Sequence, residues 1–306
     1  MIYTVTLNPA IDYYIELEEF QEQELNNCEN SYTIMGGKGI NVSKVLDNFG
    51  IKTLALGFIG GFTGDYIKKD FCLAKMKEQF TELKENTRIN VKMKTKVGES
   101  EIAGKAPNIS EEDLKRFYKT LEQIKEGDLL VLSGSVPKSL SDEIYAEVIA
   151  RVPKGVRIIL DARGKAFAKA LEKGVYFTKP NQKELEEYFE REIDNLEELV
   201  AAAKELQKRG SQYVIVSRGG EGSFCVTEDK VLIGNAPRGK VISSVGAGDS
   251  MVAGILYALE KGYSIEEAYP YGIAAGSATA FSEGLTNLQD MERIKEKVIV
   301  KEYQEK

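Results

Sequence analysis

The feature that most constrains this fold is a regular alternation of apolar strands and amphipathic helices after Pro107. Each strand-like run is almost continuously apolar, as expected for parallel strands buried on both faces of a sheet. The runs span residues 129–133, 156–160, 175–178 and 213–217, and helical patterns such as 141–151 and 195–209 separate them. This alternation predicts an α/β fold with a doubly wound, mostly parallel sheet flanked by helices.

Two segments of the first half interrupt this pattern, because polar and apolar residues alternate in them with a period of two. In 11–18 and in 89–97 every second residue is apolar, and Lys92, Lys94 and Lys96 lie on the other face of the second segment. We expect half-buried antiparallel strands, with the lysines as solvated charges and a hairpin turn at Gly98-Glu99. The two segments would form a small β-sheet attached to one domain that spans residues 1–306.

A glycine-rich turn in the second half of the chain, Val245-Gly246-Ala247-Gly248-Asp249, follows an apolar run at 241–245 and precedes a helical pattern. Free backbone N–H groups at a helix N-terminus bind anions, and glycines let the chain approach a phosphate closely. Asp249 would repel a phosphate, but it could take the proton of a hydroxyl while the N–H groups hold the charge that develops. The alternative is a tight turn in which Asp249 only caps the helix.

Composition excludes several classes of function. The chain has no histidine, which removes the Ser-His-Asp triad and zinc-histidine sites, so any proton transfer must use other side chains. The net charge of −7 argues against nucleic acid and anionic membranes as partners. Three cysteines without a Cys-x-x-Cys pair, together with the lack of a signal peptide or a transmembrane-length apolar run, predict a cytoplasmic protein.

Another glycine-rich motif, Gly36-Gly37-Lys38-Gly39-Ile40-Asn41, also leads into a helical pattern. Amide groups suit the hydroxyls of a sugar-like ligand and the Lys38 ammonium suits a phosphate, whereas the alternative is a flexible turn with a solvated lysine. The chain contains no P-loop motif. The Gly-x-Gly at 246–248 is followed by Met251 instead of a third glycine, which disfavours a dinucleotide-binding fold.

Taken together, the motifs at 36–42 and 245–249 resemble those of the ribokinase-like (PfkB) family of carbohydrate kinases. The stretches at 6–12, 87–92 and 133–137 are similar to the branch that contains 1-phosphofructokinases and tagatose-6-phosphate kinases. The similarity spans nearly the whole chain in the family's order. It implies a β lid formed by about 10–35 and 86–106.

The resemblance also implies a set of site residues. Asp249 would be the catalytic base, and the anion hole would be formed by Gly246, Ala247 and Gly248. The substrate-binding residues would be Asp12, Gly36, Gly37, Asn41 and Ser135 at the sugar, with Lys38 and Arg88 on its phosphate. The nucleotide-binding residues would be Lys179, Asn181, Glu184, Ser217, Gly220, Gly222, Gly248 and Ala275, and Glu184 would act indirectly on the metal.

The activity that the resemblance implies is ATP- and Mg²⁺-dependent phosphorylation of a ketohexose monophosphate. Fructose 1-phosphate, giving the 1,6-bisphosphate, is favoured over tagatose 6-phosphate. A monovalent cation is a further expected cofactor, although Ser243 departs from the acidic residue or Asn that many family members have at that position. The alternatives are a kinase of a neutral sugar or nucleoside and a non-catalytic regulator that binds sugar phosphates. A homodimer through the lid is also expected, because exposed sheet edges invite pairing.

Overall fold

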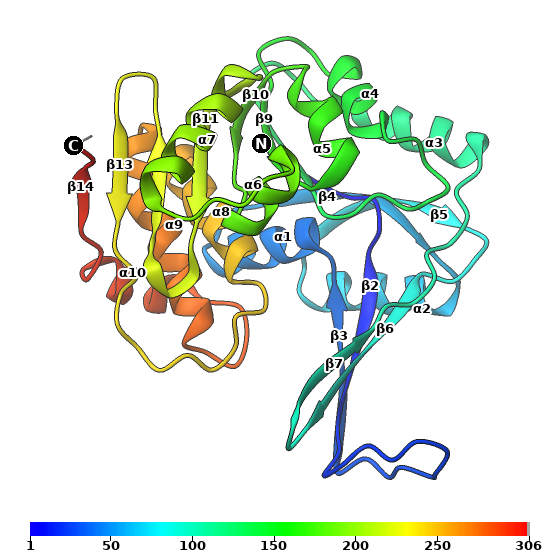
Figure 1. Cartoon of the computed structure of the whole chain (residues 1–306). Helices are drawn as coiled ribbons and strands as arrows, with labels where there is room; N and C mark the ends of the chain where they lie inside the picture. Colours follow the sequence, from blue (N-terminus) through cyan, green and yellow to red (C-terminus); the bar gives the residue numbers. More distant parts are fainter. Residues whose placement is uncertain (305–306) are drawn as a thin grey trace.

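The apolar runs of the sequence pair into one ten-stranded sheet in the computed structural model, which describes residues 1–304 (Figure 1). The strands lie in the order β14 (Val300–Glu302), β13 (Val231–Gly234), β12 (Ser223–Val226), β11 (Ser211–Ser217), β10 (Val175–Thr178), β9 (Arg157–Asp161), β8 (Leu129–Ser133), β1 (Ile2–Thr6), β4 (Thr53–Gly60) and β5 (Lys77–Leu83). Neighbours from β11 to β5 are parallel, and β12 to β14 continue the sheet antiparallel. The predicted mostly parallel sheet is therefore confirmed.

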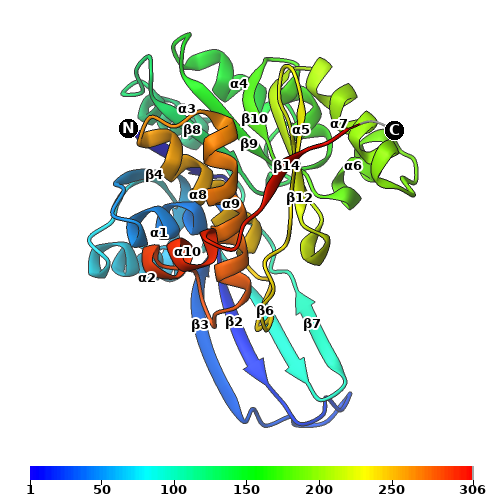
Figure 2. The same cartoon turned by 90° about the vertical axis from the view of Figure 1, so that its left-hand side faces the viewer.

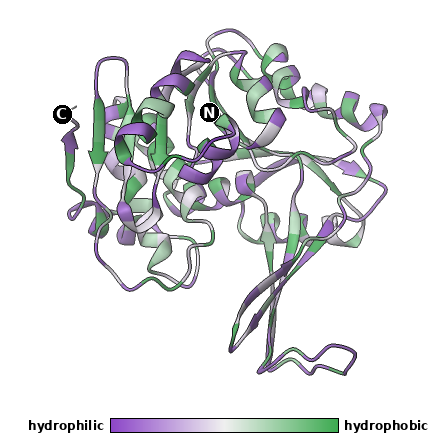
Figure 3. Ribbon diagram, viewed as in Figure 1, coloured by the Kyte–Doolittle hydropathy of each residue, from purple (hydrophilic) through white to green (hydrophobic). Residues whose placement is uncertain are grey.

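Helices cover both faces of this sheet. One face packs against α3 (Glu111–Leu121), α4 (Ile144–Arg151), α5 (Gly164–Leu171), α6 (Gln182–Phe189) and α7 (Leu196–Lys208). The other packs against α1 (Lys38–Asn48), α8 (Ala247–Glu260), α9 (Ile265–Ala280) and α10 (Leu288–Lys295), while α2 (Gly61–Leu73) lies beside β4 and β5. Successive residues of a strand enter different cores, as Leu130 and Val131 do. The inner strands are therefore mostly apolar and largely green in Figure 3, whereas the edge strands β5 and β14 are more polar.

The two alternating segments form a separate four-stranded sheet that projects from the body (Figures 1 and 2). Its order is β3 (Asn30–Gly36), β2 (Ala10–Glu16), β6 (Arg88–Thr95) and β7 (Gly98–Ile102). The antiparallel prediction holds for β2–β3 and for β6–β7, but β2 and β6 run parallel. The hairpin turn lies at Lys96-Val97, two residues before the predicted Gly98-Glu99, because Gly98 already pairs with Thr95.

The apolar run at 241–245 is not a strand, although it leads into the predicted helix. Val241, Ile242 and Val245 are each more than half exposed. The N–H groups of Ile242 and Ser243 donate to the carbonyl of Ala280 at the end of α9, so helix α9 takes the place of a neighbouring strand. Helix α8 is buried on all sides and α9 packs closely along it. Within residues 1–304, no helix is long and apolar enough to cross a membrane.

Candidate active site

A polar cavity of about 350 Å³ lies where the carboxyl ends of β1, β8 and β9 meet the small sheet. The ends of the strands, helix α1 and the small sheet all contribute lining residues: Thr6, Asn8, Ala10, Asp12, Gly37, Lys38, Asn41, Arg88, Asn90, Lys92, Glu101, Ser133, Gly134, Ser135, Ala162, Arg163 and Glu184. Ligands bind at this edge of open α/β sheets because the loops that leave the strands can vary without disturbing the core. The predicted residues Asp12, Gly37, Lys38, Asn41, Arg88, Ser135 and Glu184 are thus brought together.

Asp249 stands in the first turn of α8, which begins after Gly246 in the left-handed conformation (φ 76°). The Asp249 side chain is 6% exposed and does not itself line the cavity. Its Oδ2 accepts a hydrogen bond of 2.8 Å from the Asn41 amide, and Asn41 does line the cavity. The carboxylate therefore lies one side chain behind the cavity wall. The hydrogen bond also means that Asn41, predicted to hold sugar hydroxyls, already holds Asp249.

The surroundings of Asp249 raise its pKa to about 6. The main cause is burial, which penalises the charged form, and the negative charge of Asp161 adds to it. The Asn41 hydrogen bond and the ammonium groups of Lys38 and Lys179 act in the opposite direction. The ordinary pKa of an aspartate is lower, at 3.8. The folded environment instead places the pKa where a general base is most effective near neutral pH.

A buried carboxylate, Asp161 at the end of β9, is flanked by two ammonium groups. Its Oδ1 lies 3.2 Å from Lys38 Nζ and 3.8 Å from Lys179 Nζ, and Lys38 Nζ is 4.0 Å from Glu184 Oε1. Burial alone would raise the pKa of Asp161, but Lys179 and Lys38 outweigh it and hold this pKa below its usual value. Lys38, predicted to hold the sugar's own phosphate, thus has a carboxylate partner at the end of the cavity near Glu184.

The predicted anion hole is partly engaged within the protein. The N–H of Ala247 donates to the Ser244 carbonyl at 3.2 Å, closing a turn. Gly248 approaches Lys179 so closely that a Cβ there would lie 3.2 Å from Nζ. A side chain at position 248 would therefore crowd this lysine, which accounts for a glycine in the first turn of the helix. The Lys179 ammonium and the start of α8 thus bring positive charge close to the carboxylates of Asp161 and Asp249.

Asn181 and Glu184 form a capping box at the start of α6, where Asn181 is the N-cap and Glu184 is the third residue of the helix. Asn181 Oδ1 accepts from the Glu184 N–H at 2.8 Å, and Glu184 Oε2 accepts from the Asn181 N–H at 2.9 Å. This reciprocal pair fixes Glu184 so that its other oxygen faces Lys38. Ser217 is the last residue of β11, and Gly220 and Gly222 follow in and after a short 3₁₀ turn. These three residues lie outside the cavity.

Ala275 was expected at the nucleotide, and this contact stays a prediction. In the structure the residue is 0% exposed. It packs against α8, where a Cβ on Gly254 would come within 2.7 Å of the Ala275 Cβ. Small residues at both positions let α8 and α9 approach closely, and this packing explains the alanine.

The small sheet supplies the other wall of the cavity. Asn90 donates to Asp12 Oδ1 at 2.7 Å, and a Cβ on Gly36 would lie 2.6 Å from Asp12 Oδ2. Arg88 donates from Nη2 to the Asn8 carbonyl at 3.2 Å. The amide of the same Asn8 donates to Ser135 Oγ at 3.0 Å. Arg88 and Ser135 are therefore joined through the loop after β1.

Some polar residues in and beside the cavity were missed or misread from the sequence. Asn90 and Arg163, which line the cavity, were not proposed as site residues, and neither was the buried Asp161. Lys92 was expected to be a solvated charge, but it lines the cavity and pairs with Glu101 at 2.6 Å. The period-two alternation could have found it, because Arg88, Asn90 and Lys92 share one face of β6.

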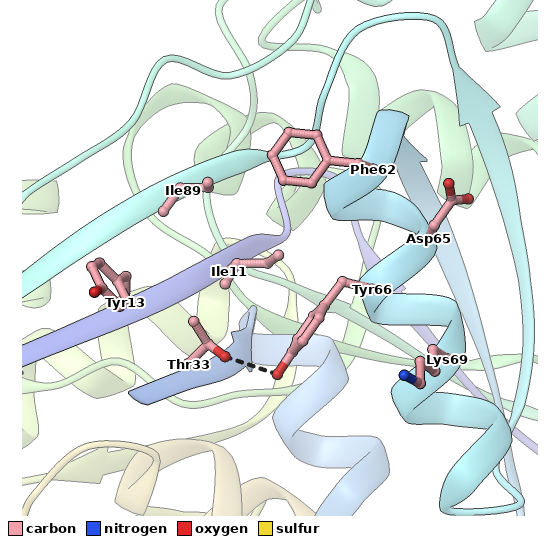
Figure 4. Close-up of a pocket in the computed structure, with 8 residues that line it drawn as sticks. All are labelled: Ile11, Tyr13, Thr33, Phe62, Asp65, Tyr66, Lys69 and Ile89. Carbon is pink, nitrogen blue, oxygen red and sulfur yellow. Dashed lines mark hydrogen bonds between the residues drawn. The ribbon is translucent and has the colours of Figure 1, made fainter. Parts of the chain in front are cut away.

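The opposite face of the small sheet borders a second, apolar groove of about 570 Å³ (Figure 4). Ile11, Tyr13 and Ile89 face it from the sheet, and α2 contributes Phe62, which is 67% exposed. Thr33 and Tyr66 close one side through a hydroxyl hydrogen bond of 2.9 Å. The small sheet is thus polar toward the cavity and apolar on its other face.

Comparison with known proteins places this site in a family context. The model of the pfkB family carbohydrate kinases matches residues 5–291. The 1-phosphofructokinase of Bacillus subtilis (strain 168) is 45% identical over 286 residues, covering 93% of this chain and 94% of the relative. A tagatose-6-phosphate kinase of Staphylococcus epidermidis is 34% identical, covering 92% and 93%. The structure of phosphofructokinase-2 from Escherichia coli in complex with potassium has a TM-score of 0.90 and 30% identity, covering 96% and 98%.

Proposed function

Because this chain belongs to the pfkB family of carbohydrate kinases, we propose that it transfers the γ-phosphate of ATP to fructose 1-phosphate, giving fructose 1,6-bisphosphate. The observation that carries this proposal is the buried Asp249 carboxylate, hydrogen-bonded to Asn41 at the wall of a cavity that also bears Arg88. A base beside an acceptor pocket with a guanidinium is what phosphorylation of an already phosphorylated sugar requires.

In this proposal Asp249 accepts the proton of the attacking hydroxyl, and Asn41 keeps the carboxylate aimed at it. Asp12, Gly36 and Gly37 hold sugar hydroxyls, while Arg88 and Ser135 hold the acceptor's phosphate. Lys38 and Lys179, together with the turn at 246–248, neutralise the charge on the transferring phosphoryl group. The loop with Ser217, Gly220 and Gly222 binds the nucleotide. Positioning and charge neutralisation supply most of the catalysis in phosphoryl transfer.

The family implies ATP as phosphoryl donor, and we propose Mg²⁺ as its companion. Within residues 1–304 no group of three or more side chains could hold a metal by itself. Mg²⁺ favours few carboxylates plus phosphate oxygens, which fits Glu184 at the cavity and the buried Asp161 Oδ2, an atom without a hydrogen-bond partner among the described residues. When bound, the ion would neutralise phosphate charge. We also propose a monovalent cation. The structure of the Escherichia coli relative in complex with potassium supports this proposal.

We further propose that the small sheet is a lid that closes over the acceptor and excludes water, which would otherwise take the phosphoryl group. A second copy of this chain is the proposed partner for its apolar face, because Phe62, Tyr13 and Ile89 leave that face exposed. Burying such a patch against an identical one is the usual route to a two-fold dimer.

A substrate panel tests the proposed activity. ATP consumption is followed with fructose 1-phosphate, fructose 6-phosphate, tagatose 6-phosphate and ribose, and fructose 1-phosphate is expected to give the highest kcat/KM. Preference for tagatose 6-phosphate would favour the other activity named among the relatives. Preference for ribose would leave Arg88 without a phosphate to bind.

Asp249→Asn separates a kinase from a binding protein. The substitution keeps the size of the side chain and one oxygen that can accept from Asn41, but it removes the base, so kcat should fall by about 10²–10⁴-fold. Binding of fructose 1-phosphate should persist. A wild-type chain that binds the sugar phosphate but turns over no ATP, like the variant, would indicate a non-catalytic regulator.

A further inference from the structure

The cations that line the polar cavity differ in whether the protein already engages them. Lys38 is paired with Asp161, and Lys92 is paired with Glu101. Arg88 donates to the main-chain carbonyls of Asn8 and Pro9. The remaining cation is Arg163, which has no hydrogen bond or ion pair with any residue in the part of the chain that the structure describes. Its guanidinium can therefore meet a ligand without first losing a partner.

Arg163 stands at the N-cap of α5, two residues beyond the end of β9 in the large sheet. Ser133 and Asp161 are register partners at the ends of β8 and β9. Ser135 and Arg163 each lie two residues beyond this pair, and both line the cavity. Ser135 Oγ in turn accepts from Asn8, whose carbonyl accepts from Arg88. Arg163 thus flanks the side of the cavity on which Ser135 and Arg88 are joined.

We propose that Arg163 is a specificity residue that binds the phosphate already carried by the acceptor, opposite Arg88. Arg88 reaches this phosphate from the small sheet and Arg163 reaches it from the large sheet, so a dianion held by both would draw the two sheets together. A guanidinium suits this role, because its planar fork can bind two phosphate oxygens at once. This inference rests on the proposed function and names the acceptor group that the cavity selects.

The chemistry also indicates which phosphate Arg163 takes. Two lysines already lie at Asp161, close to the start of α8, and in the proposed function they serve the transferring group. Beside Ser135, Arg88 alone would face a phosphate of about two negative charges, and part of its hydrogen-bonding capacity is used by carbonyls. A second guanidinium supplies the missing positive charge there. An acceptor without a phosphate would engage neither arginine.

Arg163→Ala tests this inference, with Lys165→Ala as the matched control. Lys165 is exposed, carries the same charge two residues further on and does not line the cavity. Arg163→Ala should raise the KM for fructose 1-phosphate by about tenfold, while the KM for ATP should stay within about twofold. Arg163→Lys should restore part of the loss, since it keeps the charge but not the fork. A rise in the KM for ATP instead, or an equal effect of Lys165→Ala, would overturn the inference.

A titration of fructose 1-phosphate without nucleotide keeps this test separate from that of the proposed activity. The Kd should be about tenfold weaker in Arg163→Ala than in wild type, and unchanged in Lys165→Ala. Equal Kd values for wild type and Arg163→Ala refute the role of Arg163 even if the kinase is active. A wild-type chain that binds with the expected dependence on Arg163 but has no turnover refutes only the activity, and one that does not bind refutes both.

A double-mutant cycle then asks whether the two arginines share one phosphate. If they do, the effect of Arg88→Ala combined with Arg163→Ala on the Kd for fructose 1-phosphate should differ clearly from the product of the two single effects. Two side chains that bind the same phosphate are energetically coupled. Strict multiplicativity would contradict a shared phosphate.

Discussion

Asp249 shows how a chain without histidine can hold a base that works near neutral pH. The carboxylate is buried behind Asn41, and burial raises its pKa to about 6 even though Lys38 and Lys179 pull the other way. A carboxylate at its ordinary pKa would be ionised but weakly basic. The desolvated one remains mostly ionised at pH 7 and accepts a proton more readily.

The pH dependence of kcat follows from this environment. Only the ionised form of Asp249 can accept a proton, so activity should be present above the raised pKa and lost as the pH falls through it. With saturating fructose 1-phosphate, kcat should rise from pH 5 to pH 7 with an inflection near the raised pKa of about 6. Circular dichroism at each pH checks that the fold persists.

Asn41 provides a check that Asp249 is the group that titrates, because its hydrogen bond lowers the pKa of Asp249. Asn41→Ala should move the inflection of kcat to higher pH, whatever it does to the maximal rate. A kcat that stays flat between pH 5 and pH 7.5 in the wild type would contradict Asp249 as the titrating base.

Single residues were predictable where their chemistry and motif agree. Asp249, Asn41 and Arg88 belong to segments with glycines or strand ends that bring them to one edge of the sheet. The burial of Ala275 was not predictable in this way, because it depends on the packing of α8 on α9. Arg163 was missed for the opposite reason: a lone exposed arginine has no local pattern that sets it apart.

At the scale of an element, the start of α6 serves stability and the site at once. The capping box of Asn181 and Glu184 satisfies two helix N–H groups and fixes the carboxylate that faces Lys38. Asn181→Ala should therefore lower the free energy of unfolding by about 1 kcal/mol and also reduce kcat/KM for MgATP. Urea unfolding and steady-state kinetics measure the two effects.

The same chain offers a matched control for this prediction. Asn195 caps α7 with the same hydrogen bond to the Glu198 N–H, at 2.9 Å, and it does not line the cavity. Asn195→Ala should cost a similar free energy of unfolding but leave kcat/KM for MgATP unchanged. If both variants reduce kcat/KM equally, Glu184 has no particular role at the nucleotide.

Elements were predictable where one local period dominates. The strands buried on both faces were recognised by their continuous apolar runs. The half-buried strands of the small sheet were recognised by the alternation of polar and apolar residues. The run at 241–245 carries three apolar residues of five but is exposed and irregular, and the N–H groups of Ile242 and Ser243 bond to the end of α9. No local signal distinguishes a strand from an apolar segment whose partner is a distant helix.

For the molecule as a whole, the small sheet joins two surfaces of opposite character. Its polar face lines the cavity with Asp12, Asn90 and Lys92, and its other face borders the apolar groove. Association through the apolar face would hold the sheet in place and leave its polar face free to cover the acceptor. Quaternary structure and substrate binding are therefore expected to be linked.

The last prediction concerns this association. We expect a dimer in sedimentation velocity experiments, and Phe62→Glu, which places a charge in the apolar groove, should shift it toward monomer and raise the KM for fructose 1-phosphate. Leu73→Glu is the control, because Leu73 also lies on α2 and is 71% exposed but is not part of the groove. A wild-type monomer at micromolar concentration, or equal effects of both variants, would contradict the groove as an interface, because only a charge buried against a partner costs association energy.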